Sequence, residues 1–144
     1  MNALELRRDL IVLACAASAG IHAALVPDHF AESTGAGVGF VAATAALAAV
    51  AVAVTLRPAS GLPLAGAATV LAGLLAAYAL AITSGVPLVH PDREAVDALA
   101  VATKAIEAVG LIAAAGLLGR RTSRRAAPQL VSLAVGGGPT EQRD

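Results

Sequence analysis

The sequence predicts an all-α integral membrane protein, a four-transmembrane-helix bundle that runs up-down-up-down with both termini in the cytoplasm. Hydrophobic residues make up 58% of the 144 residues and charged residues only 14%, a balance unlike that of soluble domains. The apolar residues gather in blocks of roughly 17 to 23, the length of helix that crosses about 30 Å of hydrocarbon. Short connections between the blocks favour antiparallel neighbours.

The first block covers about residues 10–26, after Arg7 and Arg8. Pro27 is expected to end or kink its helix, because proline lacks the N–H that a helix interior needs. Two arginines, an apolar run and the small residues ACAASAG also fit a cleavable signal peptide. Apolarity continues past the small residues to Val26, which favours a retained transmembrane helix. Cys15 is the only cysteine, so no internal disulfide forms.

The second, third and fourth blocks cover about residues 35–56, 63–83 and 96–118. An alanine-rich soluble bundle is the alternative, but its helices would need polar outer faces. The second block, GAGVGFVAATAALAAVAVAVTL, has none. Its glycines are expected to let helices approach closely, since GAGVG follows no strand and lacks the context of a nucleotide-binding loop.

Basic residues indicate the orientation of this domain, residues 1–119. Eight arginines precede the first block, lie between the second and third, or follow the fourth, and the opposite side holds only Arg93. Cytoplasmic loops of membrane proteins are enriched in Lys and Arg. Both termini are therefore expected on the cytoplasmic side of a plasma membrane. Residues 120–144 are predicted to form a mobile basic tail, whose Arg120, Arg121, Arg124 and Arg125 contact anionic lipid headgroups.

Charged residues at membrane depth mark the first candidate site. Lys104 and Glu107 lie near the middle of the fourth block, three residues and about 60° apart on a helix, so they are close enough to pair. His22 in the first block is expected at a similar depth if its helix runs to about residue 30, and Tyr78 in the third block is a candidate to join this set as a hydrogen-bonding residue. Buried charges usually mark function, although a self-neutralising pair that only fixes helix register is the structural alternative.

An acidic, histidine-bearing outer mouth is the second candidate site. His29 and Glu32 are three residues apart beside Asp28, and His90 and Asp97 are expected to complete a ring. Imidazole and carboxylate are metal ligands, so a divalent metal ion is the candidate cofactor. Non-functional alternatives remain for both sites. His22 can be a structural residue that hydrogen-bonds to a neighbouring helix, and the acids in the loops can simply be solvated.

Three classes of function follow. The protein binds or passes a cation or proton through these sites, or it is an accessory subunit packed against a larger membrane complex, or it is a membrane redox or metal enzyme. The third class has the weakest support, because no pair of histidines lies on facing helices and no nucleophile adjoins a base. Expected partners are the lipid bilayer and either a larger complex or a second copy of the chain, and not nucleic acid.

Topology is directly testable. Reporter domains fused after Pro58 and after Gly119 should read cytoplasmic, and one fused at Asp92 should read external, because the basic residues fall almost entirely on one side. An external C-terminus would contradict the orientation and would change which polar residues share a layer.

Overall fold

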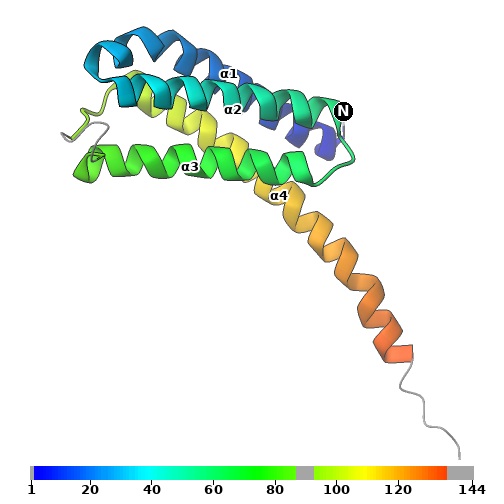
Figure 1. Cartoon of the computed structure of the whole chain (residues 1–144). Coiled ribbons are helices and arrows are strands. Elements are labelled where there is room, and N and C mark those ends of the chain that lie inside the picture. Colours follow the sequence, from blue (N-terminus) through cyan, green and yellow to red (C-terminus); the bar gives the residue numbers. More distant parts are fainter. Residues whose placement is uncertain (1, 87–92, 136–144) are drawn as a thin grey trace, which may run out of the picture.

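The part of the chain that the structure describes forms four long helices. The computed structural model describes residues 2–86 and 93–135, with side chains as far as residue 123. The helices are α1 (Ala3–Glu32), α2 (Thr34–Leu56), α3 (Leu62–Ser84) and α4 (Ala98–Val135), as Figure 1 shows. All four are long and apolar enough to cross a membrane. The predicted all-helical class and the number of apolar helices are therefore confirmed.

Helix α1 continues through Pro27 to Glu32, where the sequence predicted an end or kink near Val26. Proline removes a single donor from the helix ladder, and the following residues still support helical backbone. Ser33 then ends α1 and starts α2: its N–H donates to the carbonyl of His29, and its hydroxyl accepts from the N–H of Ala36. His29 consequently lies on α1, seven residues and about two turns beyond His22.

Helix α4 is longer than the predicted fourth span, which ended near Leu118. It begins after Asp97, whose carboxylate accepts from the N–H of Ala100 at 2.7 Å. Its helical backbone reaches Val135 and extends past the other helices (Figure 1). Alanine and arginine are strong helix formers, so much of the segment expected to be a mobile tail is helical. Residues 136–144 lie outside the described residues.

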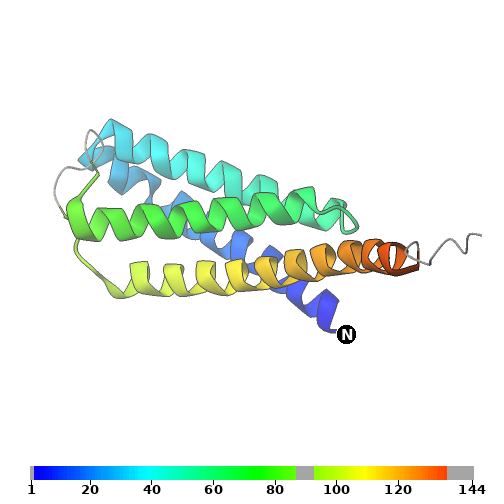
Figure 2. The same cartoon turned by 90° about the horizontal axis from the view of Figure 1, so that it is seen from below.

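The helices pack so that α1 contacts α2 and α4, while α3 contacts α4 and α2 (Figure 2). A compact apolar core joins all four of them. Its fully buried members are Ile11, Cys15, Leu47, Ala67, Leu71 and Ala114. These residues come from the start of α1, the second half of α2, the first half of α3 and the middle of α4. The core therefore fills the half of the bundle next to the turn between α2 and α3.

Three segments are joined at that end of the molecule, which we call the basic end. Arg8 of α1 donates to the carbonyl oxygen of Pro58 at 2.8 Å. Arg121 of α4 donates to the carbonyls of Ala59 and Pro58 at 3.0 and 3.2 Å. The start of α1, the turn at residues 57–61 and the region around residue 121 of α4 therefore lie together.

Large apolar side chains cover the outside of the bundle. Leu13 is 65% exposed, Val52 56% and Ile112 72%. Exposing so many side chains of this kind to water would be unfavourable, whereas lipid chains accommodate them. The surface and the helix lengths together indicate a multi-pass membrane protein.

Helices α1 and α4 approach each other closely at Gly110. A Cβ atom there would lie 2.8 Å from the Cβ of Ala14 and 3.0 Å from the Cδ1 of Leu71. Because the Cβ of Ala14 is fixed to its backbone, Gly110→Ala should force α1 and α4 apart and lower the free energy of unfolding by about 1–3 kcal/mol. Thermal unfolding in one detergent measures this loss.

Gly73→Ala is the matched control, because a Cβ at position 73 meets nothing within 4 Å. That change should be neutral or slightly stabilising. The double change Gly110→Ala with Ala14→Gly should recover part of the loss. Equal stability of the Gly110 and Gly73 variants would show that α1 and α4 do not approach so closely.

Candidate functional site

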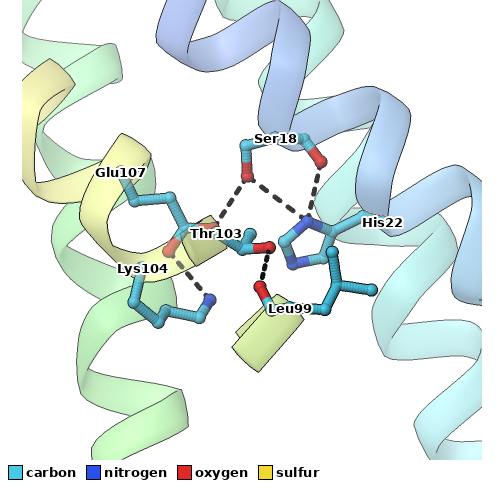
Figure 3. Close-up of polar contacts among 6 residues, drawn as sticks. All are labelled: Ser18, His22, Leu99, Thr103, Lys104 and Glu107. Carbon is cyan, nitrogen blue, oxygen red and sulfur yellow. Dashed lines mark hydrogen bonds and ion pairs between the residues drawn. The ribbon is translucent and has the colours of Figure 1, made fainter. Parts of the chain in front are cut away.

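The candidate site is centred on Glu107, whose side chain is fully buried within the bundle. Its Oε2 atom accepts from the Nζ of Lys104 at 2.8 Å, one helical turn away on α4. Its Oε1 atom accepts from the hydroxyl of Ser18 on α1 at 2.7 Å (Figure 3). A charged donor and a neutral donor thus satisfy one oxygen each, which is what a buried carboxylate requires.

Ser18 also connects Glu107 to His22, one turn further along α1. The Nδ1 atom of His22 lies 2.9 Å from the carbonyl oxygen of Ser18 and 3.3 Å from its hydroxyl oxygen. A carbonyl oxygen only accepts hydrogen bonds, so the network assigns the proton to Nδ1. The neutral ring then presents Nε2 as a lone-pair acceptor. We call Ser18, His22, Lys104 and Glu107 the polar layer.

A cavity of about 470 Å³ lies beside the polar layer, on the side away from the apolar core. His22 and Lys104 lie on its inner wall, and apolar residues such as Leu25, Ala43 and Leu74 line its sides. Four exposed carboxylates also line it: Asp28, Glu32, Glu94 and Asp97. We call these four the acidic mouth. Among the described residues, Lys104 is the only Lys or Arg in the lining.

Phe40 of α2 orders the two histidines of α1. The ring of His29 stacks on the ring of Phe40 with centroids 3.5 Å apart, and the ring of His22 lies 5.1 Å from it in a tilted arrangement. The Nδ1 of His29 lies 2.9 Å from the carbonyl of Leu25, which assigns its proton there too. Its Nε2 lies 3.9 Å from the Oε1 of Glu94. That separation is too long for a hydrogen bond and within reach of one bridging ion or water.

Tyr78 of α3 meets the polar layer through its ring rather than its hydroxyl. The Nζ of Lys104 lies 5.5 Å from the centroid of this ring, within the range of a cation–π interaction. The hydroxyl oxygen is buried, and none of the described residues hydrogen-bonds to it. Because Tyr78 lines the cavity, water or a bound solute there can supply the partner that a buried hydroxyl normally has.

The structure brings the two predicted sites to one cavity. His22, Tyr78 and Lys104 line it together with the predicted mouth residues Asp28, His29, Glu32 and Asp97, and Glu107 lies behind Lys104. His90 lies outside the described residues, as do the side chains of Arg124 and Arg125. Arg120 and Arg121 lie at the basic end. Within the described part of the chain, no three His, Cys, Asp or Glu side chains are grouped closely enough to hold a metal ion.

Three residues of the site were missed by the sequence reasoning. Ser18 had a usable signal, because it is four residues before His22 and therefore shares its helix face. Phe40 and Glu94 had none, since their contacts depend on how α2 and the segment before α4 lie against α1.

Comparison of the chain with protein-family models, with curated proteins and with solved structures finds no match.

Pairing of Lys104 with Glu107 is open to a double-mutant test. Lys104→Met should leave Glu107 buried without its cation and lower the free energy of unfolding by roughly 3 kcal/mol. Lys104→Met combined with Glu107→Gln should lose less, because the glutamine carbonyl still accepts from Ser18 and carries no charge. Thermal unfolding of the single and double variants in one detergent decides between the two outcomes. Additive losses would contradict a direct interaction.

Proposed function

We propose that the protein binds a cation from the external side of the plasma membrane, with Glu107 and Lys104 as the internal charge pair that responds to it. The observation that carries this proposal is the cavity, whose lining among the described residues has four carboxylates and one ammonium group, that of Lys104. Such a surface attracts cations and concentrates them at its opening. The buried carboxylate of Glu107 adds a further negative charge behind the inner wall.

Orientation follows from the two ends of the bundle. The basic end holds Arg8 and Arg121 beside the turn at residues 57–61, and the positive-inside tendency would place it in the cytoplasm. Four helices that cross up-down-up-down then put the acidic mouth outside. This arrangement also leaves both termini inside, as the distribution of arginines along the sequence predicts.

The packing favours binding over passage through a single chain. Between Glu107 and the basic end, the bundle is filled by Ile11, Cys15, Leu71 and Ala114, all of them fully buried. This apolar packing offers no polar partners that would replace the water of a moving ion. A cation that reaches the polar layer would therefore leave by the acidic mouth unless the helices rearrange.

The pairing inside the chain argues against the accessory-subunit alternative. That alternative expects a partner helix to neutralise the charged face of α4, but Glu107 has both of its donors within this chain. Within the described helices, the carboxylate at this depth therefore needs no partner from a larger complex.

A divalent metal is the first cation to test. His29 and Glu94 offer two ligand atoms 3.9 Å apart, near the span of one ion with bonds of about 2 Å to each. Asp28, Glu32 and Asp97 line the same cavity and can add water-mediated contacts. Calorimetric titration of the purified protein with zinc, copper(II) and manganese should give saturable binding that weakens on acidification, because ligation requires neutral imidazole.

His29→Ala and Glu94→Gln should each weaken this binding by at least about tenfold, or 1.4 kcal/mol, because each removes a ligand atom. Arg57→Ala, at the basic end, is the matched control and should leave it unchanged. Lys104→Met should strengthen binding, since it removes the competing ammonium from the cavity wall. Absence of saturable binding for all three metals would exclude the divalent ions. Binding equal in the His29 and Arg57 variants would place the ion elsewhere.

A further inference from the structure

Two arginine side chains converge at the basic end. The Nη2 atoms of Arg8 and Arg121 both donate to the carbonyl oxygen of Pro58, at 2.8 and 3.2 Å. The two nitrogens are therefore at most about 6 Å apart. Within the described part of the chain, neither guanidinium forms an ion pair with a carboxylate. Like charges held this close repel each other unless an anion neutralises them.

A groove of about 730 Å³ adjoins this pair, between the start of α1 and the second half of α4. Arg8, Arg120 and Arg121 line it together with Leu4, Leu117 and Gly119. Arg7 adds a further guanidinium nearby, because its Nη1 atom lies against Gly116. The acids of this part of α1 are Glu5 and the exposed Asp9. The carboxylate of Glu5 accepts a hydrogen bond from the backbone N–H of Asn2. Neither carboxylate lines the groove.

We propose that this groove binds the phosphate headgroup of an anionic phospholipid. Guanidinium groups bind phosphate oxygens through several N–H donors at once, and the convergence of Arg8 and Arg121 provides such donors from two helices. The groove lies where the apolar span of α4 ends, the level at which headgroups lie beside a transmembrane helix. Leu4 and Leu117 supply apolar wall for the first part of an acyl chain.

A free phosphate ion shares the headgroup chemistry but not the apolar wall. Bound lipid would connect α1 to α4. Its phosphate would neutralise the positive charge of Arg8 and Arg121, which both hydrogen-bond to the turn at residues 57–61. The site is independent of the cation cavity, which lies at the opposite end of the bundle, so either assignment can fail without the other.

Native mass spectrometry of the full chain, released from nanodiscs of equal parts phosphatidylglycerol and phosphatidylcholine, tests the proposal. The wild-type protein should retain phosphatidylglycerol well above its share of the bilayer. R8Q with R121Q should reduce this retention about ten- to thirtyfold, at about 1 kcal/mol for each arginine. R57Q removes one charge from the same end outside the groove and should change retention by less than about threefold.

Gly119→Leu separates lipid binding from folding. A Cβ at position 119 meets nothing within 4 Å, so leucine fills the groove, keeps every arginine and favours helix. This variant should lose phosphatidylglycerol while its circular dichroism and melting temperature stay at wild-type values. Retention equal to wild type in Gly119→Leu, or equal losses in R57Q and R8Q/R121Q, would overturn the site. Competition by millimolar inorganic phosphate, without lipid retention, would overturn the lipid assignment.

Discussion

A carboxylate buried at membrane depth is the constraint on which the rest of this structure depends. Glu107 has no exposed surface, and an ionised carboxylate in such surroundings is tolerated only with a nearby cation and hydrogen-bond donors. Lys104 supplies the cation from the same helix, and Ser18 supplies a donor from α1. Because Ser18 and Glu107 come from different helices, their hydrogen bond fixes how α1 and α4 face each other.

The polar layer divides the bundle into two unlike halves. Toward the basic end, close packing of small and branched apolar residues leaves little room between the helices, as the approach of Gly110 to Ala14 illustrates. Toward the acidic mouth, the same four helices enclose a cavity with carboxylates, imidazoles and aromatic rings on its walls. Glu107 lies at the boundary. If the proposed cation binds in the cavity, its charge acts next to Glu107, whose hydrogen bond to Ser18 joins α1 to α4.

The sequence predicts some of these features because they depend on local spacing or composition. The four spans follow from hydropathy, and the approach of Lys104 to Glu107 follows from their separation of three residues on one helix. The meeting of Ser18 with Glu107 depends on the rotation of α1 about its axis, which an alanine-rich sequence with weak amphipathicity does not specify. Helix α1 does not end at Pro27, because one lost hydrogen bond does not end a helix whose following residues still support it. At the end of α4, helix-forming alanines and arginines continue beyond the apolar span, so hydropathy marks the span and not the helix.

The central claim is that Glu107 is an ionised carboxylate held by Lys104 at the boundary between the cavity and the apolar core. Infrared difference spectroscopy in lipid bilayers, comparing the wild-type protein with Glu107→Gln, measures this state directly. The account predicts that the wild-type protein shows a carboxylate stretching band that is lost in Glu107→Gln. In Lys104→Met, the carbonyl band of a protonated acid should replace it. A protonated-acid band in the wild-type protein that disappears in Glu107→Gln would contradict the account, because Glu107 would then be neutral without its lysine.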